Sequence, residues 1–302
     1  DYQNRSIQNA VEATREMYSP PSRAAQKNID YGFITKQSKE GHLVTPCIFP
    51  NILRVLKKDP EFVGKFRRNT FSNMTETLEG DGKFLPLNDA VILKAREFIA
   101  ENFSAFDRVS KDMVTDAILT VSFDFLVNPP RDYFSSLAWD KTPRLNSWLH
   151  STYGTPDDSL HQAMGSNWLK GLLKRVMYPG CQFDEVLALE SPQGWRKSTS
   201  IRVLGAPWHV ETAHSIDTKD FYILLAQNVV VEFSEGEIFD RSSMKKIKAE
   251  VTKTEDQFRP PYERGMVKFP RSCVFVVTTN ELELKDDTGN RRWLPFVIGD
   301  NI

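Results

Sequence analysis

The first residues that could do chemistry form a loop between an apolar run and a helical segment. From Ser191 to Thr199 the loop reads S-P-Q-G-W-R-K-S-T. In such a loop, backbone N–H groups surround phosphate, Lys197 neutralises its β/γ charge and Ser198 binds Mg²⁺. Ser191 and Arg196 occupy the two glycine positions of the usual G-x-x-x-x-G-K-[ST] pattern, so a chance surface loop is the alternative. The expected nucleotide contacts are Pro192, Gln193, Gly194, Trp195, Arg196, Lys197, Ser198 and Thr199.

Two carboxylates follow the next apolar run of the sequence. Residues 228–235 read N-V-V-V-E-F-S-E and place Glu232 and Glu235 three positions apart. Phosphoryl transfer uses one acid in the Mg²⁺ shell and another to orient or deprotonate the attacking water. We therefore expect Glu232 at the metal and both glutamates in catalysis, with an exposed acidic turn as the alternative.

Two more polar positions follow in the order found in phosphate-loop ATPases. Residues 274–280 form a third apolar run that ends in Asn280, the position at which those enzymes sense the γ-phosphate, although such an Asn is usually a turn residue. Arg291 and Arg292 precede the last run and could act as arginine fingers on a neighbouring subunit's γ-phosphate. A solvated arginine pair is the alternative, but four signals in this order together predict an ATPase site.

Apolar runs that alternate with helical segments must position these residues. Continuous runs of this length indicate strands buried on both faces of a parallel sheet. We expect an α/β fold, with a phosphate-loop NTPase core of three layers and a mostly parallel sheet. The expected strands are 186–189, 229–233, 274–279 and 294–298, and the expected helices between them are 197–204, 218–226 and 242–253.

The sequence before this core divides into two parts. Residues 1–45 are polar and predict a linker or flexible arm with one short helix near 10–17. Residues 46–149 show helical spacing and predict a small helical domain; a winged helix is one form of it, and a plain helical packing domain is the alternative. The ATPase core occupies 150–302 and begins with a long helix after Asp158. The chain lacks an initiator Met, and we expect a fragment cut at both ends.

The composition excludes some classes of protein. The 302 residues include 39 Lys+Arg against 40 Asp+Glu, which excludes a polybasic protein but allows a local basic surface. Cys47, Cys181 and Cys273 are too few and too far apart for a disulfide framework or a metal motif, and they fit a reducing cytoplasm. The apolar runs are far shorter than the roughly 20 residues of a membrane span.

Several motifs together resemble the virulence-associated protein E family. The resemblance is strong from Leu137 to Ile298 and weaker over 59–132, and Lys141 stands where the family has glycine. Its motifs lie at 131–134, 137–145, 192–194, 197–199, 219–220, 232–235, 258–264, 270–271, 278–280 and 288–292.

That family is similar to superfamily-3 helicases, which are ring-forming AAA+-like ATPases of phages and mobile elements. The resemblance implies ATP and Mg²⁺ as cofactors, single-stranded DNA as a partner, and self-association into a ring, expected to be a hexamer. It also implies an attached primase or primase-polymerase domain, no membrane, and the cytoplasm of a bacterial host. By position, Lys197 and Ser198 take the ATP and Mg²⁺ role, Glu232 with Glu235 the acidic role, Asn280 the sensor role, and Arg291 or Arg292 the finger role.

The basic segment from Arg241 to Arg271 is the expected DNA surface. It holds nine basic and four acidic residues, and its phosphate binding would depend on salt. Superfamily-3 helicases project a hairpin into the ring channel, and residues 260–269 are consistent with one. The resemblance makes Lys268 the leading DNA contact and Tyr262 a stacking platform, and assigns Arg259 and Arg264 to phosphate across a subunit boundary or to DNA. A solvated basic helix face beside an ordinary hairpin is the alternative.

The first hypothesis is therefore an ATP-dependent DNA helicase or replication-initiation ATPase. The alternative is a hydrolysis-deficient DNA-binding or assembly scaffold attached to a primase, which the substituted glycine positions motivate. A third hypothesis is a fragment that mainly docks a primase through residues 1–130.

Overall fold

A computed structural model describes residues 29–212, 216, 218–234, 241–259, 265–280 and 292–299, with no side-chain description for 241–245. The predicted short helix near 10–17 lies outside these residues. The chain forms two compact units that divide after Ser136, thirteen residues before the expected boundary at 149. None of the described helices is both long and apolar enough to cross a membrane.

The first unit contains the predicted helices, and polar residues cap some of their starts. The hydroxyl of Ser110 accepts the N–H of Met113 at 3.1 Å and so caps the helix that begins at Lys111. Apolar faces of the three longest helices pack together into one core. The unit's elements are β1 (Lys36–Gln37), β2 (Leu43–Val44), α2 (Phe49–Lys58), β3 (Phe66–Asn69), β4 (Met74–Leu78), β5 (Phe84–Pro86), α3 (Asp89–Asn102), α4 (Lys111–Ser122), β6 (Leu126–Val127) and α5 (Pro129–Ser136).

Beside the expected helices, a four-stranded sheet in the order β5-β4-β3-β6 makes this unit α+β, so it is not the plain helical packing domain of the alternative. The sequence pattern does not predict these strands, because β3 and β4 carry few apolar residues. Glu76 of β4 accepts hydrogen bonds from Arg67 and Asn69 of β3, both at 2.7 Å. These buried or half-buried polar pairs hold the strands together without an alternating apolar pattern.

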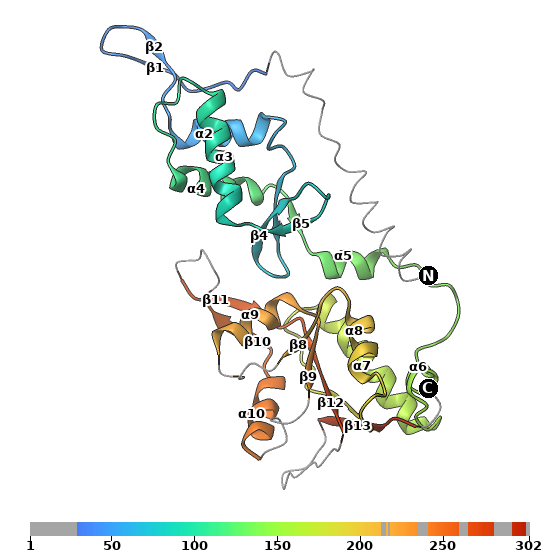
Figure 1. Cartoon of the computed structure of the whole chain (residues 1–302). Helices are drawn as coiled ribbons and strands as arrows, with labels where there is room; N and C mark the ends of the chain where they lie inside the picture. The colour runs from blue at the N-terminus through green and yellow to red at the C-terminus, as the bar shows by residue number, and fades with distance from the viewer. Residues whose placement is uncertain are drawn as a thin grey trace. The chain divides into compact units, whose positions relative to one another are not determined.

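The second unit, from Leu137 onward, contains the predicted α/β core. Its strands at 186, 230, 274 and 293 begin within one residue of the expected positions, and α7 is capped by Asp158, whose carboxylate accepts the N–H groups of Leu160 and His161. Figure 1 shows the elements α6 (Trp148–Tyr153), α7 (Ser159–Met177), β7 (Val186–Glu190), α8 (Lys197–Gly205), β8 (His209–Thr212), α9 (Lys219–Gln227), β9 (Val230–Ser234), α10 (Arg241–Val251), β10 (Glu255–Phe258), β11 (Val267–Pro270), β12 (Val274–Thr279) and β13 (Trp293–Val297).

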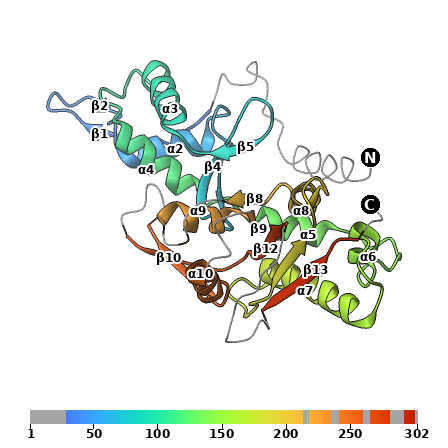
Figure 2. The same ribbon diagram turned by 60° about the horizontal axis from the view of Figure 1, so that its bottom comes forward.

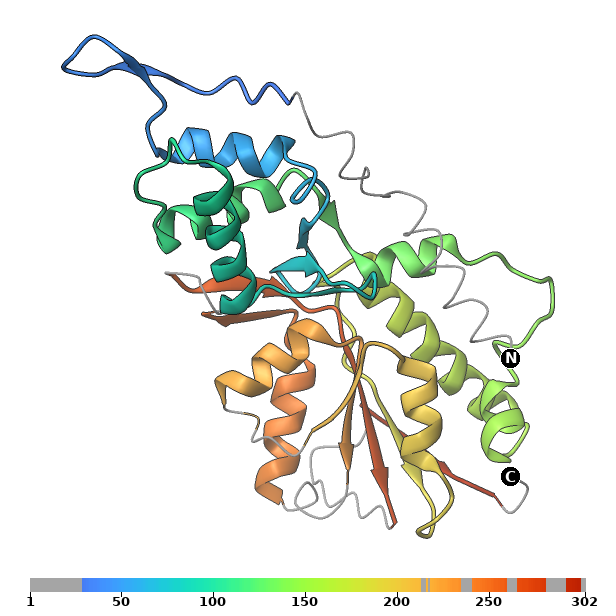
Figure 3. The same cartoon turned by 45° about the horizontal axis from the view of Figure 1, so that its top comes forward.

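Five parallel strands form the sheet of this unit, in the order β13-β7-β12-β9-β8. Figure 3 shows the strands between α9 and α10 on one side and α7 and α8 on the other. On the first side, Phe221 of α9 and Ile247 of α10 join the core of the sheet. On the other side, Gly205 at the end of α8 lies so close to Val230 that a Cβ there would be only 2.9 Å from the valine side chain. The three-layer arrangement is thus observed.

The strand order places a ligand-binding position at the carboxyl end of β7. The connection from β7 runs to β8 at one edge, whereas the later connections run back towards β13 at the other edge. Open parallel sheets bind ligands where neighbouring connections diverge in this way. The loop 191–196 and the start of α8 occupy this position.

Two smaller features surround the sheet. The strands β10 and β11 pair antiparallel, with Phe258 opposite Val267, and form a hairpin just before β12. A hairpin was expected at 260–269, but its first arm lies earlier, at 255–258. Figure 2 shows that β13 runs towards α6. The N–H of Gly299, after β13, donates to the carbonyl of Tyr153 in α6.

Candidate functional site

A pocket of about 500 Å³ opens at the carboxyl ends of the parallel strands. Residues 193–199 form one wall, and Glu211, Ser234, Thr278 and Asn280 form the rest. These residues come from the loop after β7 and from the ends of β8, β9 and β12. They meet because the carboxyl ends of parallel strands lie at the same edge of the sheet, and the pairing of Ser234 with Thr278 shows this register directly.

The loop backbone takes a shape that glycine usually provides. Arg196 is the N-cap of α8 and has left-handed backbone angles, with φ 54° and ψ 25°. A residue with a side chain rarely adopts this region. Lys141, which stands where the family has glycine, is also left-handed, with φ 67°. Two of the three departures, Arg196 and Lys141, therefore keep the backbone conformation that glycine usually provides, whereas Ser191 does not have a positive φ.

Lys197 is the best-anchored cation of the pocket, with only 8% of the residue exposed. Its Nζ donates to the carbonyl oxygen of Ser191 at 2.6 Å, to the Ser191 hydroxyl at 3.0 Å and to the Pro192 carbonyl at 3.2 Å. It also reaches Oδ1 of Asn280 at 3.4 Å. The side chain that replaces the first glycine, Ser191, thus becomes a partner of the lysine.

Glu232 lies beneath the pocket and is fully buried. Its Oε1 accepts from the Thr278 hydroxyl at 2.7 Å, and its Oε2 lies 2.9 Å from Nε2 of His209. Burial by itself raises the pKa of Glu232, but hydrogen bonds from His209, Ser198 and Thr278 together outweigh it, so the pKa lies below its usual range. Glu232 is therefore a carboxylate at neutral pH.

The donors present fit Mg²⁺ bound together with a nucleotide. The Ser198 hydroxyl lies 3.4 Å from that of Thr278, and since Thr278 gives its own hydrogen to Glu232, Ser198 can donate to Thr278 and keep lone pairs for a cation. Among the described residues, no group of three or more His, Cys, Asp and Glu could hold a metal ion. A site with few protein ligands suits Mg²⁺, which usually keeps several waters and binds substrate phosphates.

Arg292 lies far from this pocket within the same chain. It precedes β13, whose first residue pairs with Val186 at the beginning of β7, so it lies at the amino ends of the strands, whereas the pocket lies at their carboxyl ends. The length of β7 alone separates these two ends by roughly 15 Å. Arg292 donates to Asp184 at 3.1 Å and is partly exposed. The structure therefore brings Lys197, Ser198, Glu232 and Asn280 together and leaves Arg292 apart.

Four predicted site residues lie outside the described part of the chain: Glu235, Tyr262, Arg264 and Arg291. The remaining DNA candidates are exposed on the hairpin, near the connection between β10 and β11. Lys268 is 67% exposed at its side chain and forms an ion pair with Glu255 at 2.7 Å across the two arms. Arg259, directly after β10, is also exposed.

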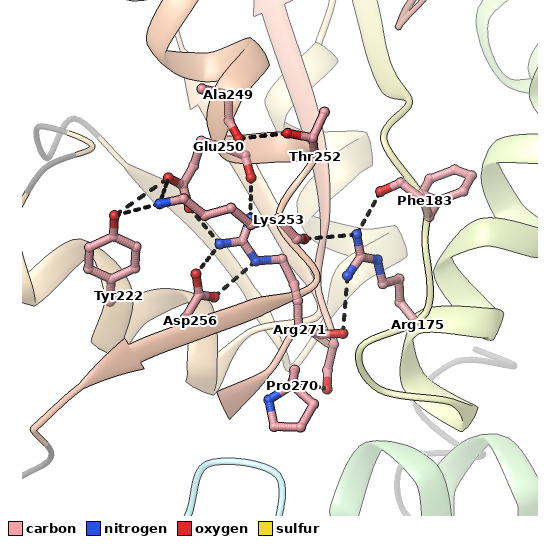
Figure 4. A network of polar contacts seen from close by, with 11 residues as sticks. Arg175, Phe183, Tyr222, Ala249, Glu250, Thr252, Lys253, Asp256, Pro270 and Arg271 are labelled. Carbon is pink, nitrogen blue, oxygen red and sulfur yellow. Dashed lines mark hydrogen bonds and ion pairs between the residues drawn. The ribbon is translucent and has the colours of Figure 1, made fainter. Parts of the chain in front are cut away.

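The hairpin is anchored by a buried ion network, shown in Figure 4, which we call the Arg271 network. Nε of Arg271 donates to Asp256 at 2.9 Å, and its other nitrogens donate to the carboxylate and backbone carbonyl of Glu250. Arg175 of α7 donates to the backbone carbonyl of Arg271 at 3.4 Å and to that of Phe183 at 2.7 Å. Burial by itself lowers the pKa of Arg271, but its acidic neighbours outweigh this and raise the pKa, so the guanidinium stays charged.

This network corrects the expected basic surface. Arg271 was counted in that surface, but its side chain is fully buried and neutralised by Glu250 and Asp256. Lys253 also pairs with Glu250, at 2.7 Å. The basic excess available to DNA is therefore smaller than the sequence count indicates.

Sequence reasoning missed His209 and Glu211, both on β8. His209 contacts Glu232, and Glu211 lines the pocket and pairs with Glu232 in strand register. The four residues H-V-E-T of β8 carry no apolar run, so they gave no strand signal. The spacing of two polar residues at i and i+2 was the available signal, because both then face the same side of a sheet.

Comparisons with known proteins agree with part of this description. Residues 134–302, more than half of the chain, match the family model of the virulence-associated protein E-like domain. Two apo structures of the C-terminal region of NrS-1 are similar at 11% identity, with TM-scores of 0.47 and 0.45. The similarity covers 77% and 78% of this chain and 58% of each of those chains. No curated protein matches the sequence.

Proposed function

The chain belongs to the virulence-associated protein E-like family, and we propose that its second unit is the phosphate-loop ATPase core of a DNA helicase or replication-initiation ATPase. The observation that carries the proposal is the convergence of Lys197, Ser198, Thr278 and Asn280 on one pocket at the switch point of a parallel sheet. An AAA+-like or superfamily-3-like role follows from the resemblance of the motifs, and this geometry supports it.

Each side chain has a defined task in this proposal. The ammonium of Lys197 leaves the loop carbonyls for the β- and γ-phosphates, and the α8 N-terminus and the loop N–H groups bind the same charge. Mg²⁺, held with the help of Ser198, supplies charge neutralisation and positions the phosphates when bound. Asn280, 3.4 Å from Lys197, is placed to contact the γ-phosphate or the attacking water. Glu232 orients Ser198 through the hydroxyl of Thr278, and Glu235 is proposed as the second acid.

The separation of Arg292 from the pocket supports catalysis between subunits. An arginine at the amino ends of the strands is too far from a nucleotide bound at their carboxyl ends in the same subunit, so it can serve only a neighbour's nucleotide. We therefore propose a ring oligomer, expected to be a hexamer, with Arg291 or Arg292 as the finger. Single-stranded DNA, contacted by the hairpin, and a primase or primase-polymerase domain are the proposed partners, in a phage or mobile-element context.

The test is phosphate release from ATP with Mg²⁺, with and without single-stranded DNA. We expect DNA-stimulated turnover in the wild-type chain and a loss of about a hundredfold or more in Lys197→Ala. Lys170→Ala is the matched control, because Lys170 is an exposed lysine of α7 outside the pocket. Wild-type turnover no higher than that of Lys197→Ala would overturn the proposal.

One observation favours the alternative of a hydrolysis-deficient scaffold. Lys197 is satisfied by the loop itself, through Ser191 and Pro192, and Arg196 brings a bulky side chain to the phosphate loop. A loop closed in this way could bind ATP without cleaving it. Tight ATP binding without phosphate release would support the scaffold, whereas DNA-stimulated release would exclude it.

A further inference from the structure

A line of buried polar side chains crosses three neighbouring strands beneath the pocket. His209 of β8 contacts Oε2 of Glu232 at 2.9 Å, and Thr278 of β12 donates to Oε1 of the same carboxylate at 2.7 Å. Thr278 also lies 3.4 Å from the hydroxyl of Ser198, at the start of α8. The line therefore runs from the edge strand of the sheet to the phosphate loop.

Burial makes this arrangement costly unless every group is paired. The side chains of His209 and Glu232 are only 7% and 0% exposed. An ionised carboxylate only accepts, so Nε2 of His209 must carry the hydrogen and donate it. With His209 on one oxygen and the Thr278 hydroxyl on the other, the orientation of Glu232 is fixed from both sides. A buried network in which all members are satisfied is rigid.

We propose that His209 is a positioning residue of the nucleotide site. By holding Oε2 of Glu232, it directs the carboxylate towards Thr278 and Ser198, so that the Ser198 hydroxyl points its hydrogen inward and its lone pairs towards the pocket. His209 itself lies beneath the pocket wall and acts through Glu232. The inference rests on the proposed function for the ligand of Ser198, a Mg²⁺-nucleotide, but the contact between His209 and Glu232 does not depend on it.

The chemistry of the two neighbouring residues explains why a histidine suits this position. A donor on β8 must reach across to β9, where Glu232 is paired in register with Glu211 and His209 with Val230. The contact is therefore diagonal, and a long planar side chain with a terminal N–H spans it. Glutamine places an N–H at a similar reach, whereas leucine has similar bulk but no donor.

The first experiment tests the contact without nucleotide. Urea unfolding is measured for His209→Leu, for Glu232→Gln and for the double variant. We expect His209→Leu to lower the folding equilibrium constant about tenfold in the wild-type background. In the Glu232→Gln background the loss should be less than about threefold, because the partner of His209 is then an uncharged amide. Equal losses in both backgrounds would overturn the inference.

The second experiment tests positioning through equilibrium binding of a fluorescent ADP analogue, with Mg²⁺ or with a chelator. We expect His209→Leu to reduce the Mg²⁺-dependent gain in affinity about tenfold, as is typical for loss of an outer-shell contact, and to leave Mg²⁺-free binding unchanged. His209→Gln should recover most of the gain. His42→Leu is the matched control, since His42 is exposed in the first unit. Thermal unfolding of each variant verifies that it is folded.

The outcomes separate this inference from the proposed function. If the wild-type chain binds nucleotide with a Mg²⁺-dependent gain that His209→Leu leaves intact, the inference is wrong and the proposed function stands. If the wild-type chain binds no nucleotide, the proposed function fails and the positioning role fails with it. Equal loss in His209→Leu and His209→Gln would also overturn the role, because only packing would then matter.

Discussion

Two buried polar networks lie in the second unit, and they differ in what their donors face. In the Arg271 network, the guanidinium donates to Glu250 and Asp256, and all these groups are buried by protein. In the network around Glu232, the last members, Ser198 and Thr278, form part of the wall of a pocket of about 500 Å³.

This difference separates a structural network from one that can bind a ligand. Charges that are completely paired inside the protein fix the geometry of the elements they join, here the hairpin, α10 and α7. Charges and hydroxyls that border a pocket can exchange their protein partners for phosphate or a cation. Changes in the first network should therefore alter stability, and changes in the second should alter ligand binding more than stability.

The largest effect is expected for Arg271→Met. Removal of the guanidinium leaves Glu250 and Asp256 buried together without their cation, which should cost about 3–5 kcal/mol of unfolding free energy in urea titrations. Lys268→Met in the same hairpin is the control and should cost less than about 0.5 kcal/mol, because Lys268 is exposed. A loss of stability for Arg271→Met as small as that for Lys268→Met would show that Glu250 and Asp256 do not depend on the guanidinium for neutralisation.

Glu232→Gln should have a smaller effect on stability, and that effect should depend on pH. We expect a loss of about 1–3 kcal/mol at pH 7, since the amide cannot accept all the bonds made to the carboxylate. Because the pKa of Glu232 is lower in the folded chain than in the unfolded chain, the unfolded chain binds the proton first as pH falls below the ordinary value of 4.5. The stability difference between the wild-type chain and Glu232→Gln, measured by thermal unfolding, should therefore shrink as pH falls below 4.5. A constant difference across this range would contradict the expectation.

Substitutions at Lys268 and Glu255, the exposed ion pair of the hairpin, should change DNA binding modestly and in opposite directions. Lys268→Gln should weaken single-stranded DNA binding a few-fold and flatten its salt dependence by about 0.7 in log–log slope. Glu255→Gln removes the competing partner of Lys268 and should strengthen binding about twofold. Fluorescence anisotropy at several salt concentrations measures the affinity and its salt dependence for each variant. A change of the same direction and size in the two variants would exclude Lys268 as a DNA contact.

The smallest effect is expected where a side chain occupies a glycine conformation. Arg196→Gly should raise stability by about 0.5–1 kcal/mol, because glycine adopts the left-handed region without strain. Arg196→Ala is the control, since it removes the charge and keeps the strained conformation. Thermal unfolding compares them, and an equal gain in both would attribute the effect to charge instead.

The sequence predicted the parallel core well because its strands are continuous apolar runs. Once the strands were placed, the shared carboxyl edge of a parallel sheet brought Lys197, Ser198 and Asn280 together. The sequence could not predict β8, since His209 and Glu211 replace the apolar residues that mark a buried strand. The strand was therefore missed because its polar residues belong to the candidate site.

A buried charge also hides the first arm of the hairpin. The segment E-D-Q-F at 255–258 carries no apolar run, yet Asp256 is buried against Arg271. Burial of a charge depends on a partner fifteen residues away, which local periodicity does not record. In the first unit, Glu76 hides β4 from pattern analysis in the same way, through its contacts with Arg67 and Asn69.

Arg292 and the pocket lie at opposite ends of the parallel strands, so each subunit carries two different surfaces. On the proposed function, one surface binds a nucleotide and the other supplies an arginine. Contacts between copies are therefore heterologous and join unlike surfaces. An open row of subunits always leaves one pocket without an arginine, whereas a closed ring completes every pocket. Activity per subunit should therefore rise with assembly, and a minority of subunits in which both arginines are replaced, by Arg291→Ala and Arg292→Ala, should silence their neighbours' pockets and leave their own active.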